Sequence, residues 1–375
     1  MKFILPLTNV GVVPVRLRNT KSLQVGDKLA KTIYNEHGVA LVQRGIHLSE
    51  KMIQHLIRQD IRYVYLEDEL TNDIMIDQMI TDDLRMEVIE TIKDTFAHFE
   101  EHHTMEKAFI HDDQMQDLTS IIDQILTQMS RQQEDAISLL ADLFITDDYT
   151  FQHSLNVTIY TLAIGMKLNY SKKELGDLGL GALLHDIGKV FIDKSILLKP
   201  GPLEPEEYEI MKSHTELGFT FIRKNTNLSS VIAHCAYQHH ERLDGSGYPR
   251  QLTEKEIHPY GKIIAIADVF DAVTSDRVYR EGMLPHEGLE ILYAEASSKF
   301  DLEMVEAFKK SVAIYPTGLT VTLSDNRTGV IIGQNPNYND RPNVRILQHQ
   351  DHLIKEPYEV NLSKVFDVVI TSCHL

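Results

Sequence analysis

The spacing of hydrophobic residues divides the chain into regions of different character. Between residues 10 and 66, short β-rich runs are separated by turn signals at Val25–Asp27 and at Asn35–Gly38. The segment "HLSEKMIQHLIRQDI" has apolar residues at helical spacing after Ser49, a residue type that favours the first position of a helix. "RYVYLED" then alternates as a strand does. Residues 1–66 therefore predict a small α+β domain.

The next region, residues 67–145, is expected to be helical and acidic. Its apolar residues recur at three- and four-residue steps, which is the spacing of one helix face. Between Glu67 and Asp117 there are 16 acidic and 3 basic side chains. The acidic residues are most simply a solvated face. This segment is either a connector or the start of a helical bundle.

The remaining sequence predicts a helical domain followed by a small β domain. Helical patterns with short loops fill residues 146–311, and "PGPLEPEE" indicates a loop that leads into a helix. After Tyr315-Pro316, the runs "LTVTL", "TGVIIG", "NVRIL" and "VFDVVI" predict strands. Residues 312–375 are therefore expected to be a structural or partner-binding β module. The fold class is multidomain and mainly α.

Composition limits the environment and the partners. The chain has 375 residues, of which 43% are hydrophobic and 25% are charged, as in ordinary soluble proteins. Its net charge of −18 disfavours non-specific binding of DNA or RNA. No apolar stretch approaches the roughly 20 residues that a membrane-spanning helix needs. The two cysteines lack metal-binding spacing, so we expect reduced thiols and a cytoplasmic location without a membrane partner.

Two aspartates in apolar surroundings carry the strongest chemical signal. Asp186 lies in "GALLHDIGK", and Asp268 lies in "GKIIAIADVFDAV". A carboxylate in such a run is costly to bury unless it is paired or bound to a metal. Five histidines in the same helical region make a shared metal site the better explanation. The candidate ligands are His153, His185, Asp186, His214, His239, His240 and Asp268.

The stretch "HHERLDGSGYP" supports the same hypothesis. Neighbouring side chains on a helix diverge by about 100°, so His239 and His240 cannot both lie deep in one apolar face. They can both reach one metal at a helix end, where the chain is about to turn. Mixed imidazole and carboxylate ligands suit iron, manganese or zinc, and the lack of cysteine ligands argues against a structural zinc site.

The order of these residues resembles a known family. The pattern H…HD…H…HH…D, with Gly247-Tyr248-Pro249 as its GYP element, is similar to that of the HD-GYP group of HD-domain phosphohydrolases. The resemblance covers residues 146–311. It implies an all-helical HD bundle that holds two divalent metal ions, with iron favoured and manganese as the alternative. It also implies hydrolysis of the bacterial second messenger cyclic di-GMP to pGpG, GMP or both.

The resemblance also assigns roles to individual residues. Asp186 would bridge the two metals. One site would be completed by His153, His185 and Asp268, and the other by His214, His239 and His240. Two such metals lower the pKa of a bridging water, which can then attack the phosphate as hydroxide.

Further residues are expected to assist around these ligands. Lys189 would place a positive charge beside the phosphate, although it could instead be a cation that complements a helix end. Arg277 and Arg280 are expected to contact phosphates or guanines, and Tyr248 to shape access to the substrate. Asp271 and Glu241 would support the ligands. The turn of the GYP loop would be set by Asp244, Gly245, Gly247 and Pro249.

One departure from the family pattern matters. Some members carry a glutamate four residues before the first histidine, where it helps to hold a third metal. This chain has Tyr149 there, so we predict a binuclear site.

Two other functions stay open at this point. The chain could be a catalytically weak regulatory protein that binds a cyclic dinucleotide, or a di-iron HD protein that senses oxygen or redox state. A homodimer, and GGDEF-type or other signalling proteins as partners, are further candidates.

Overall fold

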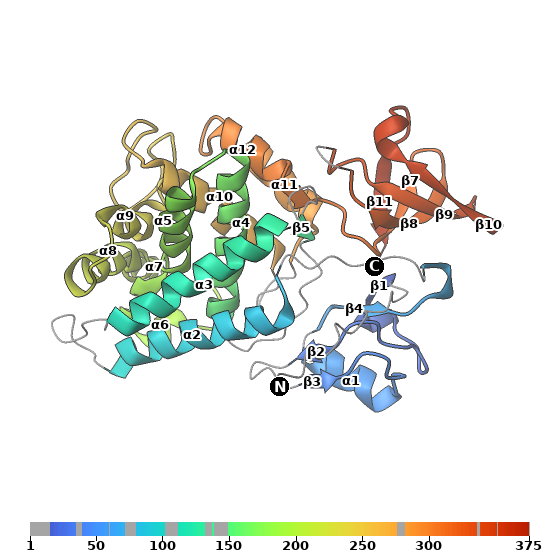
Figure 1. The fold of residues 1–375 in the computed structure, drawn as a ribbon, viewed down its shortest axis with the longest axis horizontal. Helices are drawn as coiled ribbons and strands as arrows, with labels where there is room; N and C mark the ends of the chain where they lie inside the picture. The colour runs from blue at the N-terminus through green and yellow to red at the C-terminus, as the bar shows by residue number, and fades with distance from the viewer. Residues whose placement is uncertain are drawn as a thin grey trace, which may run out of the picture. The chain divides into compact units, whose positions relative to one another are not determined.

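The computed structural model describes residues 16–34, 40–59, 61–71, 80–101, 112–131, 137–138, 149–275, 282–335, 338–350 and 352–374. These residues form two compact units, whose elements are labelled in Figure 1. The helical unit contains the described residues between 79 and 137 and between 148 and 314. The terminal unit combines the described residues up to 78, Ser138, and the described residues from 315 onward.

The helical unit is built almost entirely from helices. They are α2 (Asp82–Glu101), α3 (Asp112–Arg131), α4 (Tyr149–Lys167), α5 (Lys172–Leu183), α6 (Lys194–Leu197), α7 (Pro205–Lys212), α8 (His214–Asn225), α9 (Ser230–Gln238), α10 (Pro259–Thr274), α11 (Pro285–Ala294) and α12 (Leu302–Lys309). A 3₁₀ helix, η3 (Ile187–Phe191), follows α5, and the short strands β5 (Ile137–Ser138) and β6 (Val312–Ala313) pair. The predicted helical HD bundle is confirmed.

The centre of this unit is α4, which packs against α5, α10 and α12. The acidic helices α2 and α3 pack against α4 and α5 respectively. Their apolar stripes, which the sequence predicted, supply buried residues such as Val88, Ile92, Ile121 and Ile125. The charged positions between these stripes remain at the surface.

The terminal unit combines elements from both ends of the chain. From the N-terminal part come β1 (Arg16–Asn19), η1 (Thr20–Ser22), β2 (Ile33–Tyr34), β3 (Ala40–Val42), α1 (Glu50–Arg58), β4 (Tyr63–Leu66) and η2 (Glu69–Thr71). From the C-terminal part come β7 (Thr320–Leu323), β8 (Arg327–Gly333), β9 (Asn343–His349), β10 (His352–Asn361), η4 (Leu362–Lys364) and β11 (Ile370–His374). The last five strands form one antiparallel sheet in the order β10-β9-β8-β7-β11.

Strand β4 lies between two hydrophobic cores. Tyr63 and Tyr65 belong to a cluster that includes residues of the C-terminal sheet, whereas Val64 and Leu66 belong to a cluster around α1. The alternation in "RYVYLED" correctly predicts a strand, but both faces of β4 are buried. The predicted helix after Ser49 is also confirmed, because the Ser49 side chain accepts a hydrogen bond from the Met52 N–H at 3.3 Å.

The C-terminal strands differ from the expected ones at two places. The run "VFDVVI" was expected to be a strand, but β11 begins only at its last residue, Ile370, because the preceding residues leave η4 without joining the sheet. Strand β10 was not predicted, because it contains Pro357, which has no N–H for a ladder. The strand tolerates this proline at the edge of the sheet, where its register also shifts between Leu353 and Tyr358.

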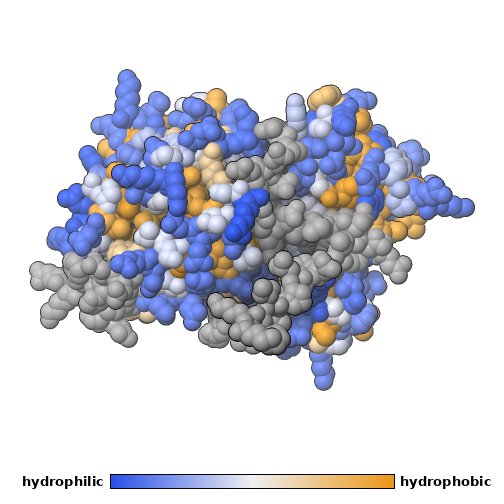
Figure 2. Space-filling model, viewed as in Figure 1, coloured by the Kyte–Doolittle hydropathy of each residue, from blue (hydrophilic) through white to orange (hydrophobic). Residues whose placement is uncertain are grey.

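The surface agrees with the polar composition. On the face drawn in Figure 2, hydrophilic residues cover most of the described surface, and hydrophobic residues form scattered patches between them. No helix within the described ranges is long and apolar enough to cross a membrane.

Candidate metal centre

The structure brings all seven candidate ligands together inside the helical unit. Their ligand atoms form two groups, each with all atoms within 4.8 Å of one another, and both groups include Asp186. The first group is Asp186, His214, His239 and His240, and the second is His153, His185 and Asp186. Asp268 joins them, because its oxygens lie 3.3 Å from His153 Nε2 and 3.7 Å from His240 Nδ1. All are buried except His240, which is partly exposed.

Asp186 reaches the centre because α5 ends early. The pattern of "GALLHDIGK" predicts a helix that stops at Gly188, but α5 stops at Leu183, and His185 and Asp186 lie in the turn before η3. Gly188 then lets η3 lie against the start of α8. A Cβ atom at position 188 would be 1.8 Å from the carbonyl oxygen of His214, closer than any real contact.

The adjacent histidines lie at a helix end, as the sequence predicted. Helix α9 ends at Gln238, and His239 is the residue that caps it. The chain turns immediately afterwards, so that His239 faces His185 and His214 while His240 faces His214 and Tyr248.

Backbone carbonyls orient three of the imidazoles. His185 Nδ1 lies 2.7 Å from the Ala182 oxygen, His214 Nδ1 lies 2.6 Å from the Met211 oxygen, and His239 Nδ1 lies 3.2 Å from the Cys235 oxygen. A carbonyl oxygen can only accept, so each Nδ1 donates its proton. A neutral ring in this tautomer presents the lone pair of Nε2, which is the atom that binds a metal.

Electrostatics favours the neutral form of the His214 and His239 rings. Burial lowers the pKa of His214 to about 4 and lowers the pKa of His239 well below its usual value. The two Nε2 atoms nevertheless lie only 3.3 Å apart. Two lone pairs at this distance repel each other unless a cation lies between them. The arrangement therefore fits a metal ion.

Two buried polar atoms give an independent indication that this centre binds a cation. Among the described residues, neither His185 Nε2 nor Asp186 Oδ1 has a hydrogen-bond partner. Such atoms are costly to bury without a partner, and both point into the cluster of ligand atoms. A bound cation would satisfy both.

His153 is held by a carboxylate instead of a carbonyl. Its Nδ1 donates to Asp271 Oδ2 at 2.7 Å, and Asn156 Nδ2 donates to the other oxygen of Asp271 at 2.9 Å. Burial would lower the pKa of His153, but the carboxylates of Asp268 and Asp271 outweigh it and raise the pKa to about 9. The sequence did not identify Asn156. Its position three residues after His153, on the same face of α4, is the signal that could have indicated it.

Lys189 lies beside the shared carboxylate. Its Nζ contacts Asp186 Oδ2, and its side chain is 26% exposed while that of Asp186 is 2% exposed. Burial would raise the pKa of Asp186, but Lys189 and the neighbouring histidines hold that pKa well below its usual value. Lys189 therefore stands between the buried carboxylate and solvent.

The GYP loop is fixed by Glu241. This buried carboxylate accepts hydrogen bonds from the backbone N–H of Arg250 at 2.8 Å and of Leu252 at 2.9 Å. Asp244 accepts from the Ser246 N–H at 2.9 Å, as its predicted turn role requires. Gly247 lies so close to the chain before it that an added Cβ atom would be 2.5 Å from the His240 oxygen.

The loop brings Tyr248 and Pro249 next to the centre. The Tyr248 ring lies 4.6 Å from the His240 ring and 6.5 Å from the His214 ring, measured between centroids. Its peptide bond to Pro249 is cis. Gly245 has a φ of +78°, which a residue without Cβ adopts readily. Arg277 and Arg280 lie outside the described residues.

Comparison with known proteins identifies the class to which this fold and site belong. The sequence model of the HD domain matches residues 114–304, about half of the chain. The chain therefore belongs to the HD-domain family, and its resemblance to the HD-GYP group is confirmed.

Several curated proteins are similar to this chain. A protein named cyclic di-GMP phosphodiesterase from Pseudomonas aeruginosa is 32% identical over 64% of this chain and 58% of its own length. A Thermotoga maritima protein with the same name is 42% identical over 44% of this chain and 45% of its own length. A Vibrio cholerae protein named 3'3'-cGAMP-specific phosphodiesterase is 36% identical over 46% of this chain and 37% of its own length. The chain thus spans about half the length of these relatives.

Proposed function

We propose that the chain is a metal-dependent phosphodiesterase that hydrolyses cyclic di-GMP to pGpG, GMP or both. The observation that carries this proposal is the presence of Asp186 in both groups of ligand atoms. One carboxylate common to two groups suits two metal ions that act on the same phosphate. The names of the Pseudomonas aeruginosa and Thermotoga maritima relatives support the same reaction.

The two groups of ligand atoms support the ligand assignment that the family resemblance implies, and Asp268 lies near both His153 and His240. Asp186 would help to hold both metals, His153, His185 and Asp268 would complete one site, and His214, His239 and His240 would complete the other. When bound, two such ions lower the pKa of a shared water and polarise the phosphate oxygens.

The protein's own side chains prepare this chemistry. The carbonyl acceptors of Ala182, Met211 and Cys235 keep three imidazoles in the tautomer that leaves Nε2 free. Lys189 offers an ammonium group at the exposed edge of the buried cluster, where it can contact a phosphate oxygen. Arg277 and Arg280 are proposed to bind phosphates or guanines, and Tyr248 to border the bound substrate.

Iron is the metal we favour, with manganese as the alternative. The proposed ligands are five imidazoles and the two carboxylates of Asp186 and Asp268, and none of them is a cysteine. Such a donor set suits either metal, so supply in the cell decides between them.

The test is hydrolysis by reconstituted protein. The full chain is loaded anaerobically with Fe(II), and separately with Mn(II), and incubated with cyclic di-GMP and with 3'3'-cGAMP. Products are resolved by chromatography, and an Asp186→Ala sample controls for contaminating enzymes. We expect pGpG or GMP from the wild-type chain and no product from the variant.

Other outcomes would favour the other functions. Protein that holds two metals, binds cyclic di-GMP tightly and forms no product would be a regulatory binding protein. A visible absorption that depends on redox state would support an oxygen-sensing or redox-sensing di-iron protein, whereas equal activity with manganese would count against it.

A further inference from the structure

A group of aromatic and cationic side chains borders the candidate metal centre. Lys212 Nζ lies 5.2 Å from the centre of the Tyr208 ring and 5.8 Å from the centre of the Tyr248 ring. The two rings are 6.5 Å apart and nearly perpendicular, at 76°. Tyr208 and Lys212 both belong to α7, and Tyr248 belongs to the GYP loop.

This group is tied to the candidate ligands through short connections. Lys212 is two residues before His214, and the carbonyl oxygen of Met211, the residue before Lys212, orients the His214 ring. Tyr248 contacts His240 on the other side. Tyr208 and Lys212 therefore lie beside the candidate metal centre, with Tyr248 between them and the imidazoles of His214 and His240.

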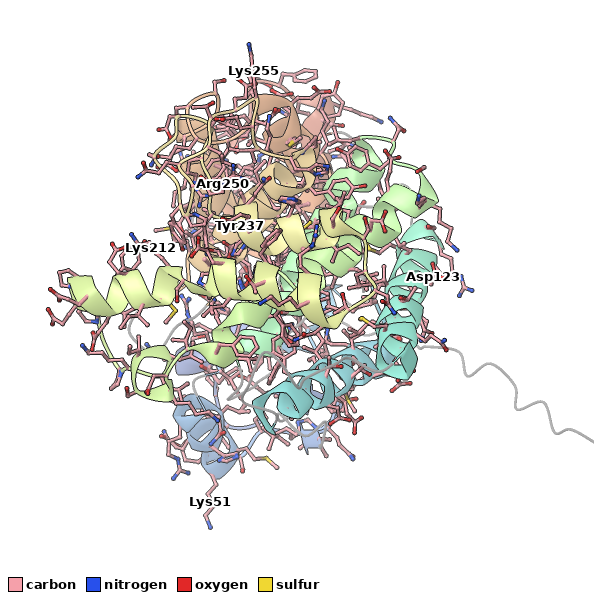
Figure 3. All side chains as sticks on the ribbon, turned by 90° about the vertical axis from the view of Figure 1, so that its left-hand side faces the viewer. Lys51, Asp123, Lys212, Tyr237, Arg250 and Lys255 are labelled. Carbon is pink, nitrogen blue, oxygen red and sulfur yellow. The ribbon has the colours of Figure 1, made fainter. Side chains whose placement is uncertain are left out.

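Both side chains of α7 are available to a ligand. Tyr208 is 48% exposed, so a large part of its aromatic side chain is in contact with solvent. Lys212 Nζ lies 2.5 Å from Glu209 Oε1; the Lys212 side chain is 23% exposed, and that of Glu209 is 69% exposed. Ion pairs that are this exposed contribute little, so a ligand can replace Glu209 as the acceptor. Figure 3 labels Lys212 at the surface of the helical unit.

We propose that Tyr208 and Lys212 form a guanine-binding subsite beside the metal centre. Tyr208 offers a ring face on which a base can stack. Lys212 can donate to O6 and N7 of guanine, which are both acceptors, whereas adenine presents a donor at N6. This inference rests on the proposed function, and it adds the side chains that select the base.

The test compares two ligands that differ only in the base. GMP and AMP are titrated by calorimetry into the full chain loaded with Mn(II), so that contacts to phosphate and metal cancel in the ratio of dissociation constants. We expect the wild-type chain to bind GMP more tightly than AMP. Lys212→Gln should reduce this preference roughly tenfold, because glutamine pairs well with adenine.

Tyr208 is tested by a pair of variants. Tyr208→Ala should weaken the binding of GMP and AMP alike, by roughly tenfold each, because every base has a face that can stack. Tyr208→Phe keeps the ring and should restore binding. Lys224→Gln, an exposed lysine at the end of α8, is the matched control and should leave the GMP-to-AMP ratio unchanged.

The outcomes separate this proposal from the proposed function. An unchanged ratio in Lys212→Gln, unchanged binding in Tyr208→Ala, or no nucleotide binding by the wild-type chain would overturn the subsite, even if cyclic di-GMP is hydrolysed. Conversely, a guanine preference that depends on Lys212 would stand if cyclic di-GMP were bound but not cut.

Discussion

At the scale of single residues, the centre depends on which ring nitrogen carries each proton. His153 is the clearest case, because its Nδ1 faces the Asp271 carboxylate and its Nε2 faces the other candidate ligands. A carboxylate can only accept from Nδ1–H, so Asp271 keeps the proton on Nδ1, and Nε2 is the nitrogen that would give up its proton to bind a metal. Asp271 is therefore a positioning residue.

The substitution Asp271→Asn tests this role. An amide nitrogen facing Nδ1 would move the ring proton to Nε2, the atom proposed to bind metal. We expect metal affinity to fall about 10–100-fold, as for other residues that orient metal-binding histidines. Competition with a chromogenic chelator measures this affinity. Asp123→Asn, on the exposed side of α3 and labelled in Figure 3, should not change it.

Lys189 has a different expected role. It contacts Asp186, but its partial exposure lets it meet a phosphate. We expect Lys189→Met to keep both metals while kcat falls about a hundredfold, as when other charge-stabilising groups are removed from an active site. Metal content and steady-state kinetics on cyclic di-GMP distinguish the two effects. Loss of metal without a further loss of activity per metal would instead assign Lys189 to holding Asp186 in place.

The sequence was most informative at this scale. Asp186 and Asp268 were recognisable because a carboxylate in an apolar helix needs a partner, and the histidines fell into a known order. Asn156, Tyr208 and Lys212 were not recognisable, because each depends on a contact with a distant segment. Tyr208, for example, gains its proposed role only from Tyr248, forty residues further along the chain.

At the scale of elements, the ends of helices position the centre. The early end of α5 was not predicted, because the apolar residues continue through "GALLHDIG" and local pattern cannot distinguish a helix from a turn that is packed on all sides. Gly188 is the physical reason why this turn can pack against α8.

We expect Gly188→Ala to be strongly destabilising. The added methyl group would overlap the His214 carbonyl, and the surrounding backbone would have to move, at a cost of about 3 kcal/mol or more. Denaturant unfolding measures the change. Gly176→Ala is the matched control on α5, where an added Cβ meets nothing within 4 Å, and it should stabilise by about 0.5–1 kcal/mol. Equal stability of the two variants would contradict the packing of η3 on α8.

At the scale of the whole molecule, the two ends of the chain share one core. Leu17, Tyr63 and Tyr65 pack in the same cluster as Leu319 and Val321, and the Leu17 N–H donates to the Gly318 oxygen at 3.0 Å. The sequence places residues 1–66 and 312–375 in separate domains, and those boundaries stay a prediction. The local sequence pattern could not indicate this association, because hydrophobic periodicity shows which face of an element is buried but not which segment packs against it.

A chain that ends at residue 314 tests whether the N-terminal region folds without the C-terminal sheet. Removing the sheet would expose Leu17 and Tyr65, which are 0% and 1% exposed in the full chain. We expect the amides of β1 and β4 to lose their protection from hydrogen exchange, because β1 loses the cluster that buries Leu17 and β4 loses one of its two cores. Residues 149–275 have their own core, so their amides should keep their protection from exchange. Measured by mass spectrometry in the same sample, these residues serve as the internal control. Retained protection in β1 and β4 would mean that α1 and its core suffice, and that the N-terminal region is the independent domain which the sequence predicts.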